Sequence, residues 1–310
     1  MQVYWATIFI FPVAVTKSIE SLLSAFLWKG TSLATTGAKV AWKDLCFPKS
    51  EEGLGLKRIK VWNQAATTKH IWTLLSDSCS IWSQWIHSHL IKKRPFWNLP
   101  MPPNPSWSWR KILQAREWSL GWFRNRIGNG LDTSLWYDYW LPSGQRPIDI
   151  VSQRNLSSTW LPWNATVARI IEDGNWNFPR EGPDLSHLWA DLNAPPSPTE
   201  RDSIEWIHTS SGQFTIASAW DILREKRPAH KLFHLLWHPL HVPRQSFIMW
   251  MAAQSRLRTK DRMHWANMED RNCKLYNLGQ ETIITCFFSA GILSRSGRQF
   301  NYESTLHGRT

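Results

Sequence analysis

The chain has few cysteines. Its 310 residues include four, and they lie far apart along the sequence: Cys46, Cys79, Cys273 and Cys286. Four scattered thiols exclude the dense disulfide framework that holds small secreted domains together. We therefore expect the chain to fold in a reducing compartment around a hydrophobic core, because a chain of this length is large enough to build one.

Long apolar runs are also missing. The one apolar stretch, from Val3 to Val15, is interrupted by Pro12 and is shorter than the roughly 20 residues that span a bilayer. No basic segment precedes it and no small-residue cleavage site follows it, so the pattern does not indicate a signal peptide. We expect this stretch to be a buried element of a soluble core, and we expect no membrane partner.

Motifs for catalysis are absent as well. The sequence contains no Asp-Asp pair, no glycine-rich loop of the kind that cradles phosphates and no Gly-x-Ser-x-Gly elbow. Serine, histidine and aspartate are present, but no spacing pairs them into a catalytic constellation. These absences predict that the chain has no active site of its own.

Positive charge is plentiful and unevenly distributed. The formal net charge is +12, and the segment from Arg224 to Arg262 holds nine Lys or Arg residues against two acids. Such a segment can neutralise phosphates and bind nucleic acid without regard to its sequence. The plainer interpretation is a solvated basic face, and composition alone leaves both interpretations open.

Apolar residues recur at helical spacing in several stretches. The expected helices cover 17–28, 58–75, 81–90, 109–118, 217–224 and 245–256. Two turn signals, Gly128–Gly130 and Ser210–Gly212, predict β-hairpins. The expected strand pairs are 122–127 with 135–140, and 203–208 with 213–216. We predict a mainly α fold with short β-hairpins.

Proline-rich stretches indicate where the chain divides. They lie at 95–105 and 193–198. The expected parts are a helical region over 1–92, a Trp-rich connector with a hairpin over 93–198, a small domain over 199–290 and a tail over 291–310. The tail has little periodicity and is predicted to be disordered.

Several short motifs follow one another along the chain. They are Gln2–Trp5, Phe26–Gly30, Val40–Pro48, Glu52–Leu56, Trp62–Ala65, Arg126–Gly130, Trp136–Leu141, Gly212–Thr215, Ala219-Trp220, Trp237, Val242-Pro243, Phe247, Trp250 and Thr259–Arg262. In this order they resemble the region downstream of the polymerase core in plant non-LTR (LINE-type) retrotransposon reverse transcriptases. That region ends in the reverse transcriptase zinc-binding domain. The resemblance covers residues 1–290.

The resemblance implies a zinc site whose ligands are mostly gone. In the family, a Cys-x-x-Cys pair, a His and a last Cys form a closed tetrahedral site. Here only Cys273 matches, because the second Cys position is Tyr276, the His position is Thr285 and the last Cys position is Ala290. Cys286 lies one residue after the His position. The resemblance therefore implies a degenerate zinc-knuckle-like domain that would hold zinc only through unexpected ligands.

A set of basic and aromatic residues is the best candidate for contact with RNA or DNA. It consists of Arg244, Trp250, Arg256, Arg258, Lys260, Arg262 and Trp265. Tryptophans can stack on bases where they are exposed, although they pack more often in a core. Further stacking candidates are Trp82, Trp85, Trp107, Trp109, Trp118 and Trp122.

Three histidines offer another metal-binding alternative. His230, His234 and His238 recur every four residues, which would place them on one face of a helix. Because apolar residues fill the gaps between them, the segment also fits ordinary packing. The sequence favours packing over a metal site.

The family resemblance implies RNA-directed DNA synthesis for the parent protein. Its polymerase core holds Mg²⁺ through a Tyr-x-Asp-Asp turn that this chain lacks. We therefore expect a reverse transcriptase fragment that does not catalyse the reaction and retains a nucleic-acid-binding C-terminal domain, located in the nucleus or the cytoplasm. The alternatives are a decayed retroelement product without activity and a scaffold for protein partners that the sequence does not identify.

Overall fold

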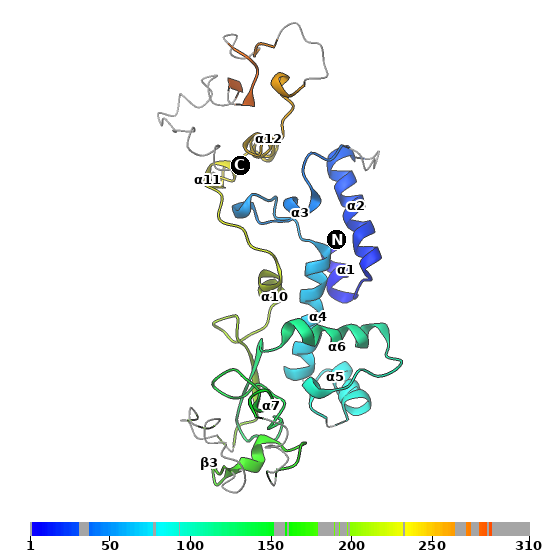
Figure 1. The fold of residues 1–310 in the computed structure, drawn as a ribbon, viewed down its shortest axis with the longest axis vertical. Coiled ribbons are helices and arrows are strands. Elements are labelled where there is room, and N and C mark those ends of the chain that lie inside the picture. Colours follow the sequence, from blue (N-terminus) through cyan, green and yellow to red (C-terminus); the bar gives the residue numbers. More distant parts are fainter. Residues whose placement is uncertain are drawn as a thin grey trace. The chain divides into compact units, whose positions relative to one another are not determined.

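The computed structural model describes most of the chain. The described residues are 2–30, 37–76, 79–92, 94–151, 159, 161–178, 189, 192, 197, 199–231, 233–263, 271–273, 279–283, 285 and 286. They form mainly α-helices with a few short strands (Figure 1), as the sequence predicts. None of the described helices combines the length and the apolar character that a membrane span requires. The predicted tail, 291–310, lies outside the described residues.

The described residues fall into two compact units. Unit 1 takes its residues from 1–20 and 57–225, and unit 2 takes its residues from 21–56 and 226–310. Each unit therefore combines two segments that are distant in the sequence. The linear division at 92 and 198 that we expect from the sequence stays a prediction.

Unit 1 is organised around the long helix α4, against which α1, α6 and α10 pack. Its helices and turns are α1 (Gln2–Ile8), α4 (Ile59–Ser76), α5 (Ile81–Ile86), the π-helical turn η3 (His87–Ile91), η4 (Phe96–Asn98), α6 (Trp107–Ser119), α7 (Pro147–Ile150), η5 (Val167–Ile170) and α10 (Ile216–Leu223). Helix α2 (Val13–Lys29) contributes residues to both units. The core between these elements includes Ile71, Leu113, Phe123 and Trp206.

Asn63, a buried polar residue of the Trp62–Ala65 motif, joins α4 to the end of α1. Its amide nitrogen donates to the carbonyl oxygens of Ala6 (2.7 Å) and Phe9 (2.6 Å), and its amide oxygen accepts from the N–H of Phe11 at 2.9 Å. The last carbonyls of a helix have no partner within the helix. Asn63 supplies those partners at the end of α1 and so fixes the turn that leads into α2.

The N-terminal apolar run is mostly exposed, which corrects the expectation of a buried element. Tyr4, Ile8, Phe9 and Val13 are all exposed, whereas Ala6 is buried. The run divides into α1 and α2 on either side of the Asn63 turn. Because α1 packs on α4 along one face, its other face keeps its apolar side chains in solvent.

The strand pairing in unit 1 differs from both predicted hairpins. Strand β1 (Phe123–Arg126) pairs antiparallel with β4 (Ser203–Trp206). Residues 135–140 and 213–216 are not strands. Phe123 lies opposite Trp206, and their ring centroids are 5.3 Å apart in the core. Phe123 and Trp206 are far apart in the sequence, so a local turn signal cannot predict that they pair. A second small sheet joins β2 (Ile171–Glu172) to β3 (Asn175–Trp176).

Asp202 organises the Gly128–Gly130 loop. Its Oδ1 accepts hydrogen bonds from the backbone N–H groups of Gly128 and Gly130, both at 2.8 Å. Its Oδ2 accepts from the N–H of Asp132 at 3.1 Å and from the hydroxyl of Thr133 at 2.9 Å. Gly130 has φ +71°, a conformation that favours glycine. The motif thus folds as a nest of donors around one distant carboxylate.

The Trp136–Leu141 motif builds the second core cluster of unit 1. The indole N–H of Trp136 donates to the carbonyl of Pro162 at 3.1 Å, and that of Trp140 donates to the carbonyl of Leu135 at 2.9 Å. Both rings are buried, and both of their polar atoms are satisfied. This part of the motif therefore serves packing.

Asp138 lies buried within this cluster. Burial raises its pKa from 3.8 to about 7, and Asp202 adds to the rise. The N–H of Ser134, which donates to Asp138 Oδ2 at 2.7 Å, and the charge of Arg146 both oppose the shift. A carboxyl in this environment favours its neutral form.

Unit 2 has its own hydrophobic core. Its elements are α3 (Trp42–Leu45), η2 (Lys49–Glu51), α11 (Phe233–Leu236), α12 (Pro243–Ala253) and η6 (Lys260–Arg262). Its core residues are Val40, Leu45, Leu236, Trp250 and Met251. The carbonyl of Glu52 accepts from the indole N–H of Trp250 at 2.9 Å and from the amide of Gln254 at 2.7 Å. A Cβ at Gly53 would lie 1.8 Å from the Phe47 carbonyl oxygen, so the Glu52–Leu56 motif needs its glycine for this packing.

Candidate metal centre and nucleic-acid interface

Cys273 and Cys286 come together in unit 2. A β-bridge joins Asn272 to Gln280, and the N–H of Cys273 donates to the carbonyl of Gly279 at 2.8 Å. The two Sγ atoms lie 3.3 Å apart. With zinc–sulfur bonds of about 2.3 Å, two sulfurs on one tetrahedral zinc lie just under about 4 Å apart. The two thiols are therefore neighbours, at a separation near that of two ligands on one metal.

The protonated form of Cys286 competes with metal binding. Burial and the adjacent Cys273 together raise the pKa of Cys286 from 9.0 to about 11. Zinc binds the thiolate, and a thiol must lose its proton first. At neutral pH Cys286 is a neutral thiol, half-buried beside the buried Cys273. Neutral cysteines of this kind often pack as small apolar side chains.

The remaining positions implied by the family do not complete a site. The hydroxyl of Thr285 donates to the carbonyl of Gln280 and accepts from the N–H of Thr282, both at 2.8 Å. Tyr276 and Ala290 lie outside the described residues. No cluster of three or more His, Cys, Asp or Glu side chains suited to a metal occurs in the part of the chain that the structure describes. The described residues therefore supply two sulfurs and do not by themselves fit a closed four-ligand zinc site.

Three arginines of unit 2 project into solvent. Arg244 lies in the first turn of α12, and Arg256 and Arg258 follow the end of that helix. All three are exposed. Among the described residues, none forms a salt bridge with their guanidinium groups. These arginines are the members of the predicted interface that fit phosphate contact best.

The other cations of that interface are held within unit 2. The Nζ of Lys260 donates to the carbonyl of Asn272 at 2.8 Å and lies 3.9 Å from Glu281 Oε2. Arg262 donates to the carbonyl of Ser255. Lys260 thus ties η6 to the β-bridge residue Asn272, next to Cys273, a structural role that the sequence pattern does not reveal.

Arg227 is a second structural cation that the sequence analysis missed. Its guanidinium Nη2 lies 2.6 Å from Asp44 Oδ1, and its Cζ lies 3.7 Å from the centroid of the Phe47 ring. Its backbone N–H donates to Glu51 Oε2 at 3.0 Å. These partners lie more than 170 positions away in the sequence, so only the fold of unit 2 brings them together.

The predicted stacking residues divide by burial. Trp250 is 1% exposed and hydrogen-bonded to Glu52, so a stacking role does not fit it. Trp265 lies outside the described residues. Trp109 is buried, Trp118 and Trp122 are half-buried, and the exposed members are Trp82, Trp85 and Trp107. Stacking on bases is open only to the exposed rings.

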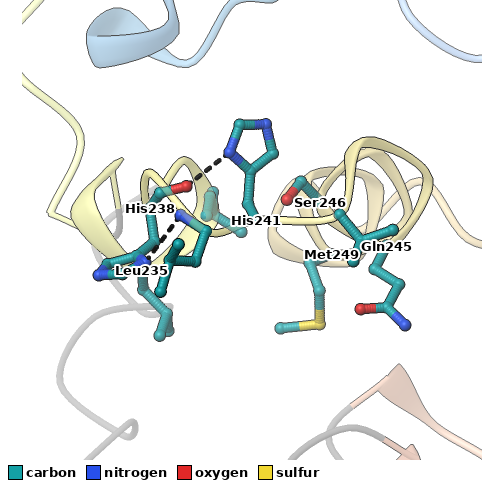
Figure 2. Close-up of a pocket in the computed structure, with 9 residues that line it drawn as sticks. Leu235, His238, His241, Gln245, Ser246 and Met249 are labelled. Carbon is teal, nitrogen blue, oxygen red and sulfur yellow. Dashed lines mark hydrogen bonds between the residues drawn. The ribbon is translucent and has the colours of Figure 1, made fainter.

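A small cavity lies between α11 and α12 (Figure 2). Its volume is about 230 Å³, and its lining includes Leu235, His238, His241, Gln245 and Met249. The Nδ1 of His241 lies 2.5 Å from the carbonyl oxygen of His238. Among the described residues that line the cavity none is acidic, so none of them offers the histidines a carboxylate for acid–base chemistry.

The predicted histidine stripe does not form. Helix α11 covers only Phe233–Leu236, so His230 and His238 lie outside it. His230 instead turns toward Glu52, with 3.8 Å between Nε2 and Oε1. The helix is too short to place three residues at four-residue spacing on one face, and the expected packing role remains for this segment.

The C-terminal part of the chain is similar to a known protein family. Residues 214–295 match the family described as zinc-binding in reverse transcriptase. That range includes Cys273, Cys286 and the exposed arginines. No solved structure matches the chain.

Two plant proteins are similar to the chain. A protein of Arabidopsis thaliana named for ribonuclease H is 26% identical over 92% of this chain and 47% of its own length. An uncharacterised mitochondrial protein of Arabidopsis thaliana is 25% identical over 46% of this chain and 92% of its own length. The chain therefore spans about half the length of the first relative.

These matches agree with the resemblance found in the motifs. The chain resembles a plant retroelement reverse transcriptase region. The match to the zinc-binding family, over 214–295, overlaps most of the domain expected over 199–290 and runs five residues beyond it. The family's description names zinc binding, whereas the described residues around Cys273 include no cluster of three or more side chains suited to a metal.

Proposed function

We propose that this chain is a nucleic-acid-binding region of a retroelement reverse transcriptase and that it does not itself carry out polymerisation. The exposed arginines Arg244, Arg256 and Arg258 carry the proposal, because no described acid pairs with them. Their partner is the phosphate backbone of RNA or DNA, which arginine neutralises without reading sequence. Polymerisation needs clustered carboxylates around Mg²⁺, and the sequence has no Asp-Asp pair.

Binding driven by phosphate contact depends steeply on salt. Each neutralised phosphate contributes about −0.7 to −0.9 to the slope of log K against log salt. We expect the full chain to bind a labelled 20-mer with such a slope. The triple variant Arg244→Gln, Arg256→Gln, Arg258→Gln should reduce the magnitude of that slope by about 2 to 3. Fluorescence anisotropy between 50 and 250 mM salt, on the order of physiological ionic strength, measures both.

A charge-matched control separates contact from net charge. Arg126, Arg169 and Arg201 are also exposed, and they lie in unit 1. Changing these three to glutamine removes the same charge but should leave the slope nearly unchanged. Equal losses in both triple variants would show that binding depends on net charge and not on contact through Arg244, Arg256 and Arg258. Absence of binding at low salt would instead support a decayed product without activity.

A further inference from the structure

Helix α5 presents aromatic side chains to solvent. Trp82 is 36% exposed, Trp85 is 52% exposed and Ile81 is 86% exposed. The opposite face of the helix packs into the core of unit 1 through Ser83 and Ile86, which are buried. The tryptophans therefore lie on the outer face of a helix whose inner face is fixed by packing.

The rings on this face are held in position. The ring of His89 stacks on Trp85 with a centroid separation of 4.9 Å and an interplanar angle of 16°. Its Nδ1 lies 2.8 Å from Ser88 Oγ and 3.0 Å from the carbonyl oxygen of Trp85. His89 lies in the π-helical turn η3. π-Helical turns are frequent at functional sites of proteins. His70 of α4 lies against Trp82, with 5.5 Å between ring centroids. We call Trp82, Trp85 and His89 the α5 aromatic face.

The surrounding sequence is strongly basic. Residues 53–116 contain ten Lys or Arg and a single acid, Asp77. Residues 117–223 contain seven Lys or Arg and 13 acids. Two exposed lysines are neighbours in sequence of these rings. Lys69 precedes His70, and Lys92 ends the η3 turn that carries His89. The aromatic side chains thus lie in an acid-poor, basic stretch of the unit 1 sequence.

This combination distinguishes between partner types. Tryptophan is also common at protein–protein interfaces, but lysine is depleted there. The exposed Lys69 and Lys92 near this face therefore favour a phosphate-bearing partner. Flat rings with nearby cations suit unpaired nucleobases, because every base has a π-face and every nucleotide carries a phosphate. Duplex DNA or RNA keeps its bases stacked within the helix and gives these rings no surface to contact.

We propose that the α5 aromatic face is a stacking site for unpaired bases of single-stranded nucleic acid. Trp85 and Trp82 contact the bases, His89 supports the ring of Trp85, and Lys69 and Lys92 lie near the phosphates. The site belongs to unit 1 and shares no residue with the arginines of unit 2. It therefore goes beyond phosphate binding, because it gives the protein a way to prefer single strands.

The test compares two labelled 12-mers with the same phosphate charge, oligothymidylate and an abasic sugar-phosphate chain. Fluorescence anisotropy on the full chain gives the ratio of their affinities. Stacking on each ring contributes a factor on the order of 10, so the wild-type chain should prefer the base-bearing strand about tenfold or more. The variant Trp82→Ala, Trp85→Ala should bring the ratio close to unity, and Trp85→Tyr should keep much of it.

Two controls make the result specific. Trp5 and Trp163 are exposed to a similar degree elsewhere in unit 1, so Trp5→Ala, Trp163→Ala should retain the full ratio. The triple arginine variant should weaken both strands equally and leave the ratio unchanged. A ratio that persists in Trp82→Ala, Trp85→Ala, or a loss as large in the Trp5 and Trp163 control, overturns the stacking site alone. Failure of the wild-type chain to bind either strand overturns this site and the proposed function together.

Discussion

The Gly128–Gly130 loop in unit 1 and the Cys273–Cys286 pair in unit 2 both lie in stretches that resemble the same family. They differ in whether the groups that each motif needs are present among the described residues. In the loop, both oxygens of Asp202 accept hydrogen bonds, four in all. In the pair, two sulfurs lie 3.3 Å apart, while the hydroxyl of Thr285 is bonded within its own turn.

The difference follows from what each motif requires. The loop is part of the fold, so loss of Asp202 would leave N–H groups without their partner and lower stability directly. A zinc site needs all four ligands at once, and the loss of one leaves the others without a metal to hold. Cysteines that remain can still pack as small side chains. Packing motifs can therefore persist beside a ligand set that is incomplete.

The largest expected effect concerns Asp138, beside the loop. Burial raises its folded-state pKa from 3.8 to about 7. Between about pH 4 and 7 the folded chain keeps this proton while the unfolded chain releases it, so the free energy of unfolding falls as pH rises. The loss approaches about 4 kcal/mol by pH 8.

Urea unfolding at several pH values measures this loss. Asp138→Asn should remove most of the decrease and raise stability at pH 8. Asp173→Asn, an exposed control on the β2–β3 turn, should leave the pH dependence unchanged. A wild-type chain whose stability is flat from pH 4 to 8 would contradict the burial of a neutral carboxyl.

The next effect tests the loop itself. Asp202→Ala removes the acceptor for the N–H groups of Gly128 and Gly130 and should destabilise the chain by about 3 kcal/mol or more. The control is Asp132→Ala, whose carboxylate lies on the surface 3.7 Å from Arg201 and whose loss should cost less than about 1 kcal/mol. Denaturant midpoints compare the two. Similar small losses would remove the contrast between loop and cysteine pair.

A smaller effect is expected in the core of unit 2, where the hydrogen bond of Trp250 can be tested by its contribution to stability. Trp250→Phe loses the hydrogen bond to the Glu52 carbonyl. Trp237→Phe, in the same core, loses no hydrogen bond, because no described residue bonds to the Trp237 indole nitrogen. The first variant should be about 1 kcal/mol less stable than the second. Thermal unfolding of both variants measures the difference, and equal melting temperatures would show that the Glu52 contact contributes nothing.

The long helices were the part of the fold that the sequence predicted well. The stretches 17–28 and 58–75 correspond to α2 (Val13–Lys29) and α4 (Ile59–Ser76). Apolar residues at helical spacing indicate such elements because each residue's face depends on near neighbours. The same locality explains the hairpin errors, since the partner of β1 is β4 and lies about 80 residues further on.

The candidate site was predicted less completely. Motif spacing matched Cys273 alone and placed Cys286 one residue after the His position, so it did not predict that the two sulfurs are neighbours. Basic composition identified Arg244, Arg256 and Arg258, but it could not separate them from Lys260, whose partners come from other segments. Burial of Trp250 likewise depends on residues 40–56, which precede it by about 200 positions. Long-range packing decides which members of a charged or aromatic set reach solvent.

The most direct test of the contrast between packing and metal binding is the zinc content of protein purified without chelator, measured beside Cys273→Ser. An incomplete ligand set predicts far less than about one zinc per chain in both proteins, with unfolding unchanged by added chelator. About one zinc per chain in the wild type, lost in Cys273→Ser, would contradict the account, because it would show that Cys273 belongs to a complete metal site.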